Sequence, residues 1–306
     1  MKTMETAKNF IYRNARPLDF ARWRYHFEND SREAVLKALA AYQNEDGGFG
    51  HGLEADCFNP NSSPIQTWTA IEILREVRMT DRRNPMIQNI LRYLESGADF
   101  DSSRNQWLNT VPSNNEYPCA VWWKYDDKGE KQREYNPTAY LAGFAIKYAE
   151  ADSKLYKLAC EIAKEAAEWF CAKAPFQEMH VTSCFIRLYG YCAEAGVQLF
   201  DMGLLLRKLK EQVNCNITKD TEKWKANYCA FPSNFIVSKN SPFYVDNMEW
   251  VNAEVKHIKE NQLPDGSFVV PWNWCNDYKE YEIAVNWWKS DIIIKKMLYL
   301  KAIEGM

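Results

Sequence analysis

The stretch Gln43-Asn44-Glu45-Asp46-Gly47-Gly48-Phe49-Gly50 decides the fold, because its pattern returns near the C-terminus. Gln262-Leu263-Pro264-Asp265-Gly266-Ser267-Phe268 again has a glutamine, three residues, a glycine, one residue and a phenylalanine, and an aspartate precedes the glycine both times. Each copy closes a run with helical periodicity, residues 34–42 and 250–261. A fixed device at equivalent helix ends is typical of a repeat architecture.

Composition excludes several classes of partner. The chain has 306 residues, 46% hydrophobic and 26% charged, which is ordinary for a soluble globular protein. A net charge of −3 provides no basic field for nucleic acid or for an anionic membrane. No apolar run approaches the roughly 20 residues that a bilayer span needs. We therefore expect neither a nucleic-acid partner nor a membrane span, and the sequence leaves the oligomeric state open.

The cysteines and the N-terminus predict a cytoplasmic protein. The first nine residues are polar and lack the apolar core of a signal peptide. The nine cysteines are an odd number, and none belongs to a CxxC pair. Most of them lie in apolar helical runs, which favours reduced, buried thiols over a disulfide framework.

Helical periodicity dominates the chain. In the run 153–174, for example, apolar residues recur at steps of three and four. The predicted helices cover residues 4–15, 31–43, 64–79, 85–96, 137–150, 153–173, 179–195, 200–213, 246–262 and 281–303. Strand signals are scarce, and residues 120–130 are expected to form a small hairpin or an extended loop with a turn at 126–130.

The connections between these helices alternate in length. Short connections make neighbouring helices antiparallel, so the long connections gather at one end of the assembly. Long loops on a rigid scaffold are where function tends to be carried. No Pro-rich or Ser-rich linker divides the chain, so we expect a single domain over residues 1–306.

The repeat resembles the QW-type repeat of the terpenoid cyclase and protein prenyltransferase superfamily, which includes the squalene-hopene cyclases. The resemblance implies an all-α fold of the α/α-toroid type, with about five to six helical hairpins in two rings around a central cavity. It also implies that Gln43 and Gln262 cap outer helices and bond to neighbouring backbone. Phe49 and Phe268 would take the places of the aromatic residue of that repeat.

The chemistry motifs of that superfamily are absent. The chain has neither a DxDD motif nor the Asp-x-Cys pair with which the prenyltransferases hold zinc. The acidic stretch 126–130 fits a turn better than a diphosphate-binding box, which needs a helix to align its carboxylates. The four histidines have no metal-ligand spacing, and GxSxG, GxGxxG and P-loop motifs are missing. We therefore expect no metal site and no cofactor.

The densest polar cluster follows the first copy of the repeat. Glu54 and Asp56 lie two residues apart, so an extended loop can point both carboxylates the same way. Two close carboxylates repel, and one of them then keeps its proton to higher pH, as general acid–base catalysis requires. His51 is a third titratable group beside them. The alternative is that Glu54 and Asp56 cap helices or pair with an arginine.

The ligand-binding candidates are of two kinds: polar residues at expected helix starts, and aromatic residues near loops. Trp and Tyr in such places can line a cavity for an apolar, cationic or sugar-like ligand, although capping or core packing explains many of them equally well. The candidates are Asn59, Asn61, Ser62, Ser63, Gln66, Trp122, Trp123, Asn136, Tyr140, His180, Trp272, Trp274 and Trp287.

Three functions compete. The first is a cyclase-like or prenyltransferase-like enzyme with an aromatic-lined cavity, in which aromatic faces stabilise a carbocation from an isoprenoid. The second is a carbohydrate-active α/α-barrel enzyme, a glycoside hydrolase or lyase, that uses two carboxylates and Trp platforms. The third is a non-catalytic binding protein on the same fold. The expected partner is a small isoprenoid-like or carbohydrate-like ligand.

Overall fold

The chain is all-α, as the sequence predicts. A computed structural model describes residues 2–129, 132 and 134–305. Its helices are α1 (Lys2–Asn14), α2 (Pro17–Phe27), α3 (Arg32–Ala40), α4 (Pro64–Glu76), α5 (Pro85–Glu95), α6 (Thr138–Tyr148), α7 (Lys154–Lys173), α8 (Met179–Ala195), α9 (Met202–Asn216), α10 (Met248–Glu260) and α11 (Tyr281–Glu304). One short antiparallel pair, β1 (Phe100–Asp101) and β2 (Gln106–Trp107), joins them, together with 3-10 turns that include η1 (Pro112–Glu116), η2 (Val121–Trp123), η3 (Lys223–Lys225), η4 (Pro232–Asn234) and η5 (Val245–Asn247).

The residues form two compact units. The middle unit is Tyr42–Cys215, and the terminal unit joins Met1–Ala41 to Asn216–Met306. Each copy of the repeat therefore belongs to a different unit. A single domain and the ring of helices that the resemblance implies both stay predictions.

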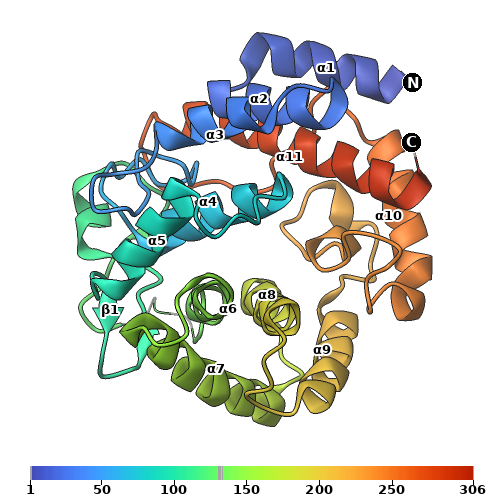
Figure 1. The fold of residues 1–306 in the computed structure, drawn as a ribbon. Helices are drawn as coiled ribbons and strands as arrows, with labels where there is room; N and C mark the ends of the chain where they lie inside the picture. The colour runs from blue at the N-terminus through green and yellow to red at the C-terminus, as the bar shows by residue number, and fades with distance from the viewer. Residues whose placement is uncertain (1, 130–131, 133, 306) are drawn as a thin grey trace. The chain divides into compact units, whose positions relative to one another are not determined.

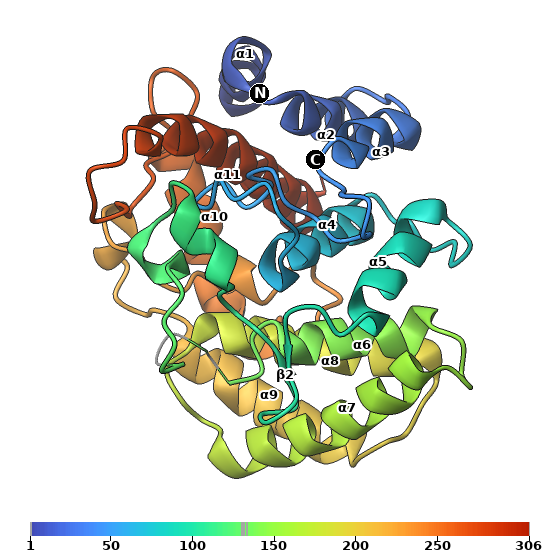
Figure 2. The same ribbon diagram turned by 90° about the vertical axis from the view of Figure 1, so that its left-hand side faces the viewer.

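Helix α6 forms the centre of the middle unit. It packs against both α7 and α8, and Figure 1 shows α6 and α8 side by side, viewed nearly along their axes. Figure 2 shows α7 next to α6, on the same unit. Gly143 permits this close approach, because a Cβ there would lie 3.1 Å from the Cα of Leu188. The continuous apolar run of α6 therefore reflects burial on nearly all sides.

The terminal unit is organised around α11. This helix contacts α1, α2 and α10, and its buried residues include Ile293, Ile294, Met297 and Leu300. One buried ion-pair group lies among these contacts: the guanidinium of Arg22 is 3.0 Å from Asp19 and 2.8 Å from Asp291. Segments from the two ends of the chain are thus joined by apolar packing and by charge.

The first copy of the repeat is held against α5 within the middle unit. Gln43 donates from Nε2 to the carbonyl oxygen of Gly47, at 3.0 Å, and to that of Met86 in α5, at 3.3 Å. Gly47 has φ +97°, and a Cβ there would lie 2.1 Å from the carbonyl oxygen of Asn89. Glycine is therefore required both for its backbone conformation and for the contact with α5.

The second copy repeats this geometry in the terminal unit. Gln262 donates to the carbonyl oxygens of Gly266, at 2.9 Å, and of Thr3 in α1, at 3.0 Å. Gly266 has φ +93°, and a Cβ there would lie 2.1 Å from the carbonyl oxygen of Thr6. The predicted bonds from both glutamines to neighbouring backbone are confirmed.

The structure differs from the predicted local structure at two places. Helix α2 was not predicted, because its aromatic run Trp23 to Phe27 obscures the helical period. No hairpin forms in the described part of 120–130. Residues 121–123 form a 3-10 turn instead, and the chain reverses at Asp126, whose carbonyl accepts from Gly129 N at 3.2 Å. That turn agrees with the predicted one, apart from Glu130, which lies outside the described residues.

We expect Ser63→Ala to lower the free energy of unfolding by about 1 kcal/mol, the usual effect of losing an N-cap. The Ser63 hydroxyl accepts from Gln66 N at 3.3 Å and so satisfies one free amide at the start of α4. Urea denaturation measures the change. Ser63→Gly is the control, with an expected loss of only a few tenths of a kcal/mol. Equal stability of wild type and Ser63→Ala would show that this cap contributes nothing.

Candidate functional site

The loop between the first repeat and α4 is packed into the protein. Glu54 is 6% exposed and Asp56 is 3% exposed. The backbone turns tightly around them, because Cys57 N donates to the carbonyl of Glu54 at 3.0 Å. Both acidic residues have interaction partners within the protein. A carboxyl group at this depth is stable only when it is paired, hydrogen-bonded or protonated.

A second segment lies against this loop. Ala120 N donates to the carbonyl of Asp56 and Phe58 N donates to that of Pro118, both at 2.9 Å, so residues 56–58 run antiparallel to 118–120. Trp122 and Trp123 follow Ala120 by two and three residues. They lie in η2 and are half-buried. The structure thus brings the chain that carries the predicted acids next to the chain that carries two of the predicted aromatic residues.

Asn59 joins the two segments through its side chain. Its Nδ2 donates to Ser113 Oγ and to Asn114 Oδ1, both at 2.8 Å. Its Oδ1 accepts from both nitrogens of Asn61, at 2.9 Å from the backbone and 3.0 Å from the side chain. Gln66 Nε2 donates to the Asn59 carbonyl at 2.9 Å. The polar groups of these three candidates are directed at the protein itself.

The repeat holds the outer edge of the same loop. The Oγ of Ser62 donates to Asp46 Oδ1 at 2.7 Å, and Asn44 Nδ2 donates to Ser62 Oγ at 3.0 Å. His51 contacts the other end of that amide, with Nε2 and Asn44 Oδ1 2.8 Å apart. His51 is exposed, whereas Glu54 and Asp56 are buried, so the three titratable groups differ in their access to solvent.

The candidates at the starts of α6 and α8 are largely structural in their contacts. Asn136 accepts a weak bond from the thiol of Cys184, at 3.6 Å. Tyr140 is fully buried, and its hydroxyl lies 3.2 Å from that of Tyr191. His180 is half-buried in the first turn of α8, where its backbone N donates to Glu178 Oε1 at 2.9 Å.

The three remaining tryptophans belong to the terminal unit. Trp272 packs edge-on against Trp288, with ring centroids 5.2 Å apart. Trp274 has no exposed surface. The ring of Trp287 lies under the guanidinium of Arg16, 4.9 Å from its centroid. Each therefore has a packing role within its own unit.

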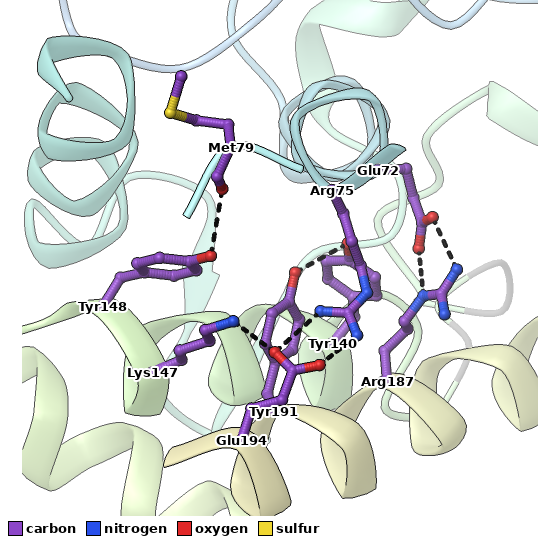
Figure 3. Close-up of polar contacts among 9 residues, drawn as sticks. All are labelled: Glu72, Arg75, Met79, Tyr140, Lys147, Tyr148, Arg187, Tyr191 and Glu194. Atoms are coloured by element: carbon purple, nitrogen blue, oxygen red, sulfur yellow. Dashed lines mark hydrogen bonds and ion pairs between the residues drawn. The ribbon is translucent and has the colours of Figure 1, made fainter. Parts of the chain in front are cut away.

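Sequence reasoning missed a charged network between α4, α6 and α8 (Figure 3). Arg187 forms two bonds to Glu72, from Nε at 2.8 Å and from Nη2 at 3.0 Å. Glu194 accepts from Arg75 at 2.5 Å and also from Lys147. These charge-assisted bonds tie the three helices together. The available signal was spacing, since Arg187, Tyr191 and Glu194 share one face of α8.

Aromatic packing accompanies this half-buried network. Tyr191 stacks against the guanidinium of Arg75, 4.8 Å from the ring centroid, and burial raises the pKa of its hydroxyl. Burial also raises the pKa of Glu194, but the hydrogen bonds from Arg75 and Lys147 outweigh it, so the net pKa is lowered. Glu194 is therefore ionised at neutral pH, and the network positions the three helices.

A second missed cluster lies in the terminal unit. Glu254 has no exposed surface, and its carboxylate accepts from Ser233 N at 2.8 Å and from Ser233 Oγ at 2.5 Å. The ammonium of Lys296 lies over the rings of Phe231 and Phe268, at 5.0 and 5.1 Å. Burial raises the pKa of Glu254 and lowers that of Lys296. The phenylalanine of the second repeat thus also contacts a buried cation.

Among the described residues, no group of three or more His, Cys, Asp or Glu is placed to hold a metal ion. In the same part of the chain, no helix combines the length and the apolar character that crossing a membrane requires. Comparison with family models, with characterised proteins and with solved structures finds no match to this chain.

Proposed function

We propose that the protein is an enzyme that binds a small organic ligand beside residues 51–63 and 112–125 and acts on it with Glu54 and Asp56. The observation that carries the proposal is the burial of these two carboxyl groups, two residues apart, on a loop fixed to the segment of Trp122 and Trp123. Buried carboxyl pairs in a rigid setting are a common basis of acid–base chemistry.

The two carboxyl groups take different roles in this proposal. One group acts as the general acid, and the other stabilises developing positive charge. The fixed loop supplies the orientation that such a proton transfer requires.

The ligand that we propose is apolar and isoprenoid-like. Two polar candidates, Asn59 and Gln66, are buried and direct their hydrogen bonds to the protein, which leaves them little capacity to recognise sugar hydroxyls. The two half-buried tryptophans offer faces that suit an apolar or cationic group. The resemblance of the repeat to the terpenoid cyclase and prenyltransferase superfamily agrees with this ligand class.

The test uses the full chain with Glu54→Gln, Asp56→Asn and both together. Equilibrium binding and product analysis are carried out with prenyl alcohols, prenyl diphosphates, squalene-like polyenes and oligosaccharides. We expect an isoprenoid to bind the wild type and the single variants alike. We expect turnover to fall about 10²–10⁴-fold in each variant, the usual contribution of a general acid or base.

Glu254→Gln is the matched control, because it also neutralises a buried carboxyl group but lies in the terminal unit. It should leave turnover unchanged in molecules that remain folded. If Glu54→Gln and Asp56→Asn lower the Tm strongly while binding and turnover persist, the pair is structural and the proposal is wrong. Binding of oligosaccharides alone would also overturn the ligand class.

A further inference from the structure

Two cysteines face each other in the middle unit. Cys57 and Cys119 are direct partners in the antiparallel pairing of residues 56–58 with 118–120. The flanking bonds run from Phe58 N to the Pro118 carbonyl and from Ala120 N to the Asp56 carbonyl. The two cysteines therefore occupy a non-hydrogen-bonded position, where the Cα atoms of an antiparallel pair lie about 4.5 Å apart and the side chains are closest. That separation lies within the range that disulfides span.

Both sulfur atoms lie on the same side of this pairing. Cys57 Sγ is 3.4 Å from Asn114 Oδ1, and Cys119 Sγ is 3.5 Å from the carbonyl oxygen of Asn114. The two thiols thus share one small polar neighbour, as cross-strand partners on one face should. Both cysteines are free thiols and are buried, at 3% and 0% exposure.

We propose that Cys57 and Cys119 form a redox modification site, in which a small-molecule disulfide such as oxidised glutathione converts the two thiols into a cross-strand disulfide. One thiolate attacks the small disulfide, forms a mixed disulfide and releases one small thiolate. The other cysteine then attacks the mixed disulfide and releases the second. The two protons lost by the cysteines pass to the two small thiolates, so two cysteines are oxidised and one small disulfide is reduced.

The cross-link would fix the segment with Glu54 and Asp56 to the segment with Trp122 and Trp123. It would close a long loop, since 61 residues lie between the two cysteines in sequence, and loops of this length gain most from closure in the chain-entropy account. The proposal does not depend on the proposed catalytic function. It concerns the pairing geometry alone.

Burial sets the rate of this reaction. A hydrogen bond with Cys119 and burial raise the pKa of the Cys57 thiol, so little thiolate is present at neutral pH. Oxidation therefore requires local opening of the pairing and becomes faster as pH rises. We expect slow, complete cross-linking rather than an immediate response.

The test treats the folded full-length protein with oxidised glutathione at pH 7 and pH 9, with and without a low concentration of urea. Alkylation of the remaining thiols and non-reducing peptide mapping by mass spectrometry follow. We expect a peptide containing Cys57 linked to one containing Cys119, formed faster at pH 9 and in urea. The oxidised protein should have a Tm several degrees higher, reversed by a reducing thiol.

Three variants test whether Cys57 and Cys119 are the cysteines that form the cross-link. Cys57→Ser and Cys119→Ser should each abolish both the cross-link and the rise in Tm. Cys275→Ser removes an exposed cysteine of the terminal unit and should leave both unchanged. The inference fails if glutathione is found on Cys275 while Cys57 and Cys119 stay reduced under every condition, or if they join other cysteines instead. It also fails if the cross-linked protein melts below the reduced one. Since the mapping is done on wild-type protein, poor folding of a variant does not affect it.

Discussion

Arg22→Met is expected to lower the free energy of unfolding by about 3 kcal/mol. Arg22 is 2% exposed and joins Asp19, which has no exposed surface, to Asp291 in α11. Methionine retains most of the apolar stem but removes the charge, so two buried carboxylates lose a partner. Arg16 and Lys295 still contact them, which places the effect at the lower end of the range for broken buried ion pairs.

The same variant should change the dependence of stability on pH. Burial raises the pKa of Asp291, but Lys295 and Arg22 outweigh it and hold the net pKa well below the usual range. Because the folded-state pKa is depressed, this group stabilises the fold fully above its unfolded pKa of about 4, and that contribution is lost as pH falls below it. Arg22→Met should therefore lose less stability than the wild type between about pH 4 and pH 2.

Urea denaturation followed by circular dichroism at pH 7 and at pH 3 measures both effects. The control is Arg24→Met on the same helix, because the Arg24 side chain is 45% exposed and its pairs with Glu28 and Asp30 lie near the surface. Such pairs contribute about 0–1 kcal/mol. If Arg22→Met and Arg24→Met lose equal amounts of unfolding free energy at pH 7, the buried ion-pair group does not stabilise the terminal unit more than a surface pair does.

The all-α fold could be predicted because the period of apolar residues is a local property. Ten of the described helices could be predicted in this way. The serine N-caps Ser63 and Ser153 mark where α4 and α7 begin. Helix α2 was not predicted because its run Trp23 to Phe27 alternates aromatic and basic residues, which obscures the helical period. The bonds from Gln43 and Gln262 could be predicted because the resemblance to the QW-type repeat implies them, and the two copies of the motif imply that both glutamines have the same role.

The contacts of the candidate site could be predicted only in part. Residues close in sequence, such as Glu54 and Asp56, were identifiable because a loop keeps near neighbours together. The pairing of residues 56–58 with 118–120, and with it the approach of Trp122, depends on contacts across 60 positions that no local pattern records. The network of Glu72 and Arg187 likewise requires the relative placement of α4 and α8. Asn59 is of a residue type that often binds ligands. Its hydrogen-bond partners in the fold give it a structural role instead.

Gly47→Ala is expected to destabilise the protein by about 3 kcal/mol, the sum of two effects. The first is backbone strain, since φ +97° is a region that residues with a Cβ rarely adopt, and this costs about 1–2 kcal/mol. The second is a steric clash, because the new Cβ would lie 2.1 Å from the carbonyl oxygen of Asn89 in α5. A backbone atom cannot rotate away, so α5 must shift, and overpacking of this kind typically costs a further 1–3 kcal/mol.

Gly97→Ala separates the two effects, because Gly97 also has a positive φ, +74°, but no atom lies within 4 Å of a Cβ placed there. It should show only the strain, about 1 kcal/mol. The terminal unit offers an independent pair of variants. In Gly266→Ala the new Cβ would clash with the carbonyl oxygen of Thr6, whereas in Gly305→Ala no atom lies within 4 Å of the new Cβ. Urea denaturation of the four variants should therefore give two large and two small losses. Equal losses within each pair would mean that the close contact between repeat and helix does not stabilise the fold, and that the motif is retained for its turn alone.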